Sequence, residues 1–224
     1  MDLNSVYKFK AADVMAYSPT SSFELCGREI KLKFDSGRHT TLTLTRSIDG
    51  GELCVSLSDG LSEVPALCQK ISDGLFLVCF AVEQFGAAYI LDTAAGLATH
   101  VVIGGDAPIE DFGCIDSAST SMRHAHSRDL EGNTVDWTFS PHTVARVRYA
   151  EGSAEVTIAD APPFEVTDCR AIRLVEGIYF LYGQGGKQGV LLAMDFTTML
   201  FNGAILSVPQ LPQLAAVGGW GRVV

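Results

Sequence analysis

Three ionisable side chains, Asp168, His39 and His142, lie beside or within short runs of β-branched residues. A carboxylate or an imidazole that is enclosed by apolar side chains has a shifted pKa and can take part in proton transfer. Together with the phenol of Tyr182, these three groups are the candidate catalytic residues. Each of the three could equally cap a turn.

Arg146 and Arg148 share one face of the alternating segment "TVARVRY". Inside a barrel an arginine needs a paired carboxylate or an anionic ligand, and it would then mark the binding site. The alternative is that both arginines face solvent while Val144 and Val147 pack inward. Further candidate ligand-binding residues are aromatic side chains with a donor group, although barrel aromatics more often fill the core: Tyr89, Trp137 and Tyr179.

Two short motifs could be mistaken for cofactor sites. "HAH" at residues 124–126 places two imidazoles on one face of an extended chain, which could hold a metal, but a solvated loop is the favoured interpretation. "GQGGKQG" at residues 183–189 is followed by a β-type run, whereas a phosphate-binding loop opens a helix, so a hairpin is predicted. There is no Ser-His-Asp order, nucleophile elbow or dinucleotide fingerprint. We therefore expect neither a metal nor any other cofactor.

Elements that could position these groups are short strands. "REIKLKF" and "TTLTLTR" alternate polar and apolar residues on either side of "DSGR", which predicts a hairpin. Helical spacing is sparse, with one short helical turn predicted around residues 109–115. Further strands are predicted at 52–57, 64–71, 75–82, 87–91, 98–103, 143–149, 153–159, 166–174, 177–182, 188–194 and 200–206.

The second half of the chain repeats the plan of the first. "DGLFLVCF" at residues 73–80 corresponds to "EGIYFLYG" at 176–183, and Asp92 corresponds to Asp195 at the same spacing of 103 residues. Self-similarity at a fixed spacing indicates an internal duplication. The sequence therefore predicts an all-β fold with two tandem lipocalin-like antiparallel barrels, which could instead merge into one pseudo-symmetric barrel.

The predicted organisation has five parts. Residues 1–22 are an N-terminal extension, 23–103 the first barrel repeat, 104–133 a polar linker, 134–208 the second repeat and 209–224 a tail that packs over a barrel end or a partner chain through Trp220.

Bulk composition excludes several classes of partner. The formal net charge of −10 disfavours nucleic acid and anionic membrane surfaces. Residues 1–19 have no apolar run typical of a signal peptide, so we expect a cytoplasmic protein whose six cysteines behave as small core residues. Composition leaves open whether the protein forms a homodimer.

The segments "SFELCGREIKLKFDSGRHTTLTL", "DGLFLVCFAVEQFGAAYILDTAAGLATHVVI" and "FEVTDCRAIRLVEGIYFLYGQGGKQGVLLAMDFTTMLFNGAIL" resemble the MoaF-like family. The family is named after a molybdenum cofactor biosynthesis protein, and the resemblance, over residues 22–206, implies lipocalin-like barrels. Family members have an aromatic and an acidic residue after the "LY" strand. This chain has Gly183, Gln184, Gly185 and Gly186 at that place, and the loss of side-chain bulk predicts a roomier entrance to the cavity. A role in cofactor assembly is therefore not carried over.

A small barrel that encloses a cavity predicts a hydrophobic or aromatic small molecule as the partner. Two functions follow: a binding or accessory protein without chemistry of its own, or a cofactor-independent isomerase, cyclase, hydratase or lyase of secondary metabolism that uses general acid/base groups. A third possible function is that of an interaction module, whose barrels are filled with side chains and whose surface does the work.

Overall fold

The structure is a computed structural model that describes residues 15–47, 51–116, 120–158, 162–185, 188–206 and 213–224. All elements in these ranges are strands, so the all-β prediction is confirmed. None of the described segments forms a helix with the length and apolar character needed to span a bilayer.

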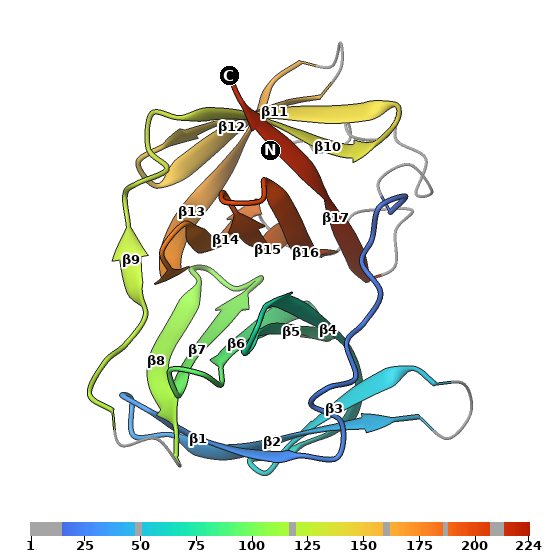
Figure 1. Cartoon of the computed structure of the whole chain (residues 1–224), viewed down its shortest axis with the longest axis vertical. Coiled ribbons are helices and arrows are strands. Elements are labelled where there is room, and N and C mark those ends of the chain that lie inside the picture. Colours follow the sequence, from blue (N-terminus) through green and yellow to red (C-terminus); the bar gives the residue numbers. More distant parts are fainter. Residues whose placement is uncertain (1–14, 48–50, 117–119, 159–161, 186–187, 207–212) are drawn as a thin grey trace. The chain divides into compact units, whose positions relative to one another are not determined.

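The chain folds into two closed, eight-stranded antiparallel barrels, as the tandem prediction requires (Figure 1). The first barrel consists of β1 (Glu29–Phe34), β2 (His39–Arg46), β3 (Leu53–Leu57), β4 (Leu61–Ser72), β5 (Leu75–Val82), β6 (Phe85–Asp92), β7 (Leu97–Ile103) and β8 (Ile109–Ile115). Neighbours along the chain pair with one another, and β8 returns to β1 to close the ring.

The second barrel uses the same order of strands. It consists of β10 (Thr134–Ser140), β11 (Thr143–Ala150), β12 (Ser153–Ile158), β13 (Phe164–Val175), β14 (Ile178–Gly185), β15 (Gln188–Asp195), β16 (Leu200–Leu206) and β17 (Leu214–Val223). The pairing of β10 with β17 closes this ring, and the short β9 (Ala125–Ser127) adds to β13.

Contacts divide the chain into two compact units, each holding one barrel. The first barrel's unit comprises Thr20–Val102 and Ile109–His124, and the second barrel's unit comprises Met1–Pro19, Ile103–Pro108 and Ala125–Val224.

The repeat that the sequence suggests is visible in the hydrogen bonds. Asp92 Oδ1 accepts from the backbone N–H groups of residues 94 and 95, and Asp195 Oδ1 accepts from those of residues 197 and 198. Gly74 and Gly177 open the two turns with φ of 79° and 75°, and a Cβ on either would meet the turn that carries the aspartate. The duplicated turns therefore need both glycine and aspartate.

Two segments differ from expectation. The helical turn predicted around residues 109–115 is wrong, because these residues form β8, which is needed to close the first barrel. The predicted tail contains β17, and Trp220 lies within this strand, 46% exposed, with its ring 4.6 Å from that of Tyr17. Neither the acidic sequence of β8 nor the glycine-rich sequence of β17 predicts a strand locally. Both segments form strands because each pairs with its neighbours when its barrel closes.

Candidate functional site

A pocket of about 400 Å³ lies at the end of the first barrel where the β1–β2, β3–β4 and β5–β6 turns meet. The apolar part of its wall comes from five strands, β3 to β7: Leu57, Leu61, Phe80, Val82, Phe85, Ala87 and Val102. Its polar part comes from Arg38, Asp59 and His100. A pocket with mostly apolar walls and a few converging polar groups is typical of small-molecule sites.

Arg38 ends the β1–β2 turn, and its guanidinium group donates in three directions. Nε donates to Asp59 Oδ2 (2.7 Å), Nη2 donates to Tyr89 Oη (2.8 Å), and Nη1 donates to His100 Nδ1 (3.0 Å). The guanidinium carbon also lies 5.7 Å from the ring centre of Phe34. The guanidinium of Arg38 therefore connects the β3–β4 turn, through Asp59, with the inward-facing Tyr89 and His100, and it lies against the ring of Phe34.

Asp59, in the β3–β4 turn, is the carboxylate partner of this cation. Its Oδ1 accepts from the buried hydroxyl of Thr40 (2.9 Å). Burial by itself raises the pKa of Asp59, but the hydrogen bonds from Arg38 and Thr40 outweigh it and hold the pKa below its usual value. For Arg38, burial alone lowers the pKa, and Asp59 and Tyr89 together raise it above the usual value. The pair is therefore ionised at neutral pH.

Tyr89 and His100 stack inside the barrel, with ring centres 4.3 Å apart and an angle of 23° between the ring planes. Burial raises the pKa of Tyr89 to about 12, although Arg38 opposes the shift. Burial and then the charge of Arg38 lower the pKa of His100 to about 3. Both side chains are therefore neutral at physiological pH. Because a guanidinium group only donates, His100 Nδ1 must accept, and the imidazole proton lies on Nε2.

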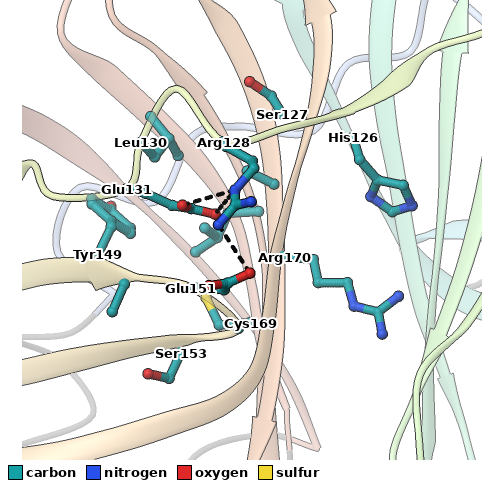
Figure 2. A pocket seen from close by; sticks show the side chains of 14 residues that line it. His126, Ser127, Arg128, Leu130, Glu131, Tyr149, Glu151, Ser153, Cys169 and Arg170 are labelled. Carbon is teal, nitrogen blue, oxygen red and sulfur yellow. Dashed lines mark hydrogen bonds and ion pairs between the residues drawn. The ribbon is translucent and has the colours of Figure 1, made fainter.

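The second barrel has a pocket of a different kind, about 270 Å³, between residues 126–131, the β11–β12 turn and β13. Figure 2 shows the guanidinium of Arg128 between the carboxylates of Glu131 and Glu151, each 2.9 Å away, while Arg170 and His126 point elsewhere. The Arg128 side chain is 69% exposed, and such exposed ion pairs contribute little to binding or stability. Burial raises the pKa of the Cys169 thiol in this pocket to about 12, so the thiol stays protonated.

Aromatic side chains pack the interior of the second barrel. Trp137 Nε1 donates to Tyr149 Oη (2.9 Å), which in turn lies 3.3 Å from Met194 Sδ. The Trp137 ring meets Phe201 edge to face, with ring centres 5.2 Å apart. The donor groups in this core are satisfied internally, as is usual for buried aromatic residues.

Of the predicted site residues, only Tyr89 lies in the first barrel's polar cluster. Trp137 belongs to the core of the second barrel, and the half-buried Tyr179 donates to Asp129 Oδ2 (2.9 Å). Tyr182 is buried on the outer face of β14, its ring centre 6.0 Å from that of Phe180. None of these three residues, nor Tyr89 itself, is among the residues that line either pocket.

Arg146 and Arg148 lie on the exposed face of β11, so the solvent-facing alternative is the one observed. Arg146 forms a two-pronged pair with Asp136 (2.7 and 2.9 Å). Val144 was expected to pack inward, but strict alternation puts it on the arginine face, 42% exposed. Val147 does lie on the opposite face, where it is half-buried.

The three ionisable candidates are all exposed. His39 begins β2 on its outer face, and His142 lies in the β10–β11 turn, where its N–H donates to Ser140 Oγ (3.2 Å). Asp168 forms a bulge in β13 with a φ of 47°. The apolar enclosure that the catalytic hypothesis requires is therefore not found around any of the three.

The roomier entrance expected at residues 183–186 is wrong for the residues that the structure describes. A Cβ on Gly183 would lie 2.6 Å from Val166, so the side chain of Val166 fills the space. Gln184 is buried, and its amide bonds the backbone of Gly104 and Gly105. Antiparallel pairing of β14 with β15 confirms the predicted hairpin, whose residues 186 and 187 lie outside the described ranges.

The two histidines of the HAH motif have different surroundings. His124 is buried with Nδ1 2.8 Å from Thr99 Oγ1, and burial lowers the pKa of His124 to about 4, whereas His126 is exposed on β9. The solvated-loop interpretation therefore fits His126 and is wrong for His124. Across the described ranges, no three His, Cys, Asp or Glu side chains gather closely enough to hold a metal ion. All six cysteines are free thiols, and five are buried, as expected of core residues.

Sequence reasoning missed Arg38, Asp59 and His100. Arg38 and Asp59 stand in turns, where charged residues are ordinarily solvated. His100 did leave a signal, because it is the one ionisable side chain in the run "LATHVVI" and shares its parity with the inward residues Ala98 and Val102.

Comparisons with protein-family models and with curated proteins find no match for this chain. Its function is therefore argued from the geometry alone.

Proposed function

We propose that the first barrel binds a small organic molecule in the pocket around Arg38. The apolar body of the ligand would pack against Phe80, Phe85 and Leu61, and its polar end would meet Arg38 and His100. The observation that carries the proposal is the guanidinium of Arg38, which is drawn into the barrel mouth by three side chains beside an apolar pocket of about 400 Å³. A half-buried cation with stacked aromatic partners is costly to build for packing alone.

Recognition is favoured over proton transfer at this site. Neither Tyr89, with a pKa of about 12, nor His100, with a pKa of about 3, changes its protonation near neutral pH. A general acid or base works best when its pKa lies near the working pH. The cofactor-independent isomerase, cyclase, hydratase or lyase is therefore the alternative proposal, with Arg38 as the group that would polarise a substrate oxygen.

The resemblance to the MoaF-like family is likewise a proposal. The tandem barrels and the duplicated aspartate turns support it, and neither feature bears on a molybdenum cofactor.

The test is native mass spectrometry of the protein purified from its source. Ala87 is buried and lines the pocket, so Ala87→Trp would fill the site. We expect a bound small molecule on the wild type and none on Ala87→Trp. The matched control is Ala150→Trp, which alters the exposed edge of the second barrel's pocket and should retain the molecule. Equal retention by all three proteins would contradict the proposal.

A further inference from the structure

Resting on the proposed function, we propose that the ligand of the first barrel is a flat, neutral molecule that presents a carbonyl-type oxygen to Arg38 and His100. Ketones, quinones, lactones and amides have such an oxygen. A carboxylate or phosphate ligand is disfavoured, even though the cluster contains an arginine.

An inventory of hydrogen-bonding groups shows that the cluster has donors to spare. The guanidinium group has five N–H bonds, and three of them point at Asp59, Tyr89 and His100. Tyr89 Oη accepts from Arg38, but Tyr89 is fully buried and does not line the pocket, so the spare donors that face the pocket belong to Arg38 and His100. His100, with its Nδ1 accepting, has its proton on Nε2. The ligand group that satisfies this surplus is an acceptor.

The charge of the cluster is already balanced. Asp59 lies 2.7 Å from the guanidinium and neutralises it. An anionic oxygen placed beside Arg38 would meet the carboxylate of Asp59 as well as the cation, and it would also lose its own hydration. A neutral carbonyl oxygen gains the same hydrogen bonds without that repulsion.

The aromatic rings beside the cluster favour a planar ligand. Phe80, Tyr89 and His100 form a stack in which the Phe80 and Tyr89 planes differ by 15° and the Tyr89 and His100 planes by 23°. Of these three rings, Phe80 and His100 line the pocket, and conjugated rings of a ligand prefer offset stacking on such rings.

Two probes of equal size test the charge directly: methyl 2-naphthyl ketone, which is neutral, and 2-naphthoate, which is anionic. Their affinities at pH 7 would be measured by isothermal titration calorimetry and ligand-observed NMR. We expect the ketone to bind the wild type about tenfold more tightly than the naphthoate, and Arg38→Lys, which removes the forked donor, to weaken the ketone about three- to tenfold, the usual worth of one hydrogen bond. Should Arg38→Lys fold poorly, His100→Phe removes the Nε2–H donor instead and should weaken the ketone likewise.

Asp59→Asn provides the decisive comparison, because it removes one negative charge and keeps the shape. We expect this variant to bind the naphthoate about tenfold more tightly than the wild type does, while its affinity for the ketone changes less than about twofold. Tighter binding of naphthoate than of ketone by the wild type would overturn the inference and leave the proposed function intact. Binding of neither probe, or equal binding by wild type and Ala87→Trp, would contradict the proposed function itself.

Discussion

The two barrels share one order of strands but differ in what fills them. Counting 103 residues from the first barrel to the second, Tyr89 corresponds to Leu192 and His100 to Gly203. In the opposite direction, Phe201 of the second barrel corresponds to Ala98 of the first. The tyrosine and histidine of the first barrel therefore correspond to a leucine and a glycine in the second. The phenylalanine of the second barrel corresponds to an alanine in the first.

This difference has a steric basis. A Cβ on Gly203 would lie 2.1 Å from the carbonyl oxygen of Leu191, so the second barrel has no room for a histidine there. Phe201 instead packs against Trp137 and Phe139. We infer that one copy of the duplicated unit retains a filled core that supports the fold, while the other leaves space and polar groups at its mouth for a guest.

The largest expected effect is on the filled core. Trp137→Ala removes a buried ring and its hydrogen bond to Tyr149, and such deletions cost about 3–5 kcal/mol. Chemical denaturation should show the loss in the transition of the second barrel, and the affinity of the first barrel for its ligand should stay the same. Trp220→Ala, at an exposed ring, is the control and should change stability much less. A loss of ligand affinity in the Trp137→Ala variant would contradict the division of roles.

Copying the second barrel's filler into the first sharpens the comparison. Ala98 is fully buried in the first barrel's core, and Ala98→Phe should overpack it at about 1–3 kcal/mol while lowering ligand affinity about tenfold or more. Calorimetric titration with the naphthyl ketone measures the second effect. Unchanged affinity would show that the free space in the first barrel is not used for binding.

Acid should weaken the first barrel before the second. The pKa of His100 is about 3 and that of His124 about 4 in the folded state, both below the value of about 6.5 expected in the unfolded state. The unfolded state therefore binds more protons, and stability is fully present above pH 6.5 and falls as the pH drops below it. Each histidine contributes a slope of up to about 1.4 kcal/mol per pH unit, or about 2 kcal/mol between pH 6.5 and 5.

Denaturant titrations at several pH values would measure this slope. His100→Gln should remove about one proton from it, whereas the control Ala150→Gln, at an exposed position of the second barrel, exchanges no titrating group and should leave it unchanged. An identical slope in the His100→Gln variant would mean that the imidazole is not held neutral in the barrel.

The smallest effect is expected at the exposed ion pairs of the second pocket. Arg128→Ala removes both pairs shown in Figure 2, yet solvent and salt already screen them. The denaturation midpoint and the affinity for the naphthyl ketone should both stay within experimental error. A clear loss of affinity would move the binding site to the second barrel.

The fold could be predicted well from the sequence where alternation and turn residues agree. The hairpin around "DSGR" and the paired turns at Asp92 and Asp195 follow from local chemistry. β8 and β17 could not be predicted, because their glycines are required by contacts with residues that are distant in sequence. A Cβ on Gly113 would meet the backbone of Lys33, and a Cβ on Gly221 would meet the ring of Trp137.

The site was less predictable than the fold. Tyr89 was found because an inward tyrosine in a barrel is a natural donor, whereas Arg38 and Asp59 stand in turns that are distant from it in sequence. Only closure of the barrel brings the three together. Arg146 was a reasonable candidate by residue type. The sequence leaves open which face of its strand points into the barrel, and in the structure Arg146 lies on the face that points to solvent.

The most direct test of the central claim is a two-dimensional NMR titration of the labelled protein with methyl 2-naphthyl ketone. If the first barrel is the receptor, shift changes will concentrate on residues 38, 57–61, 80–89 and 100–102, and they will vanish in Ala87→Trp. Changes concentrated on residues 126–131 and 149–153 of the second barrel, or spread evenly over both, would contradict the account.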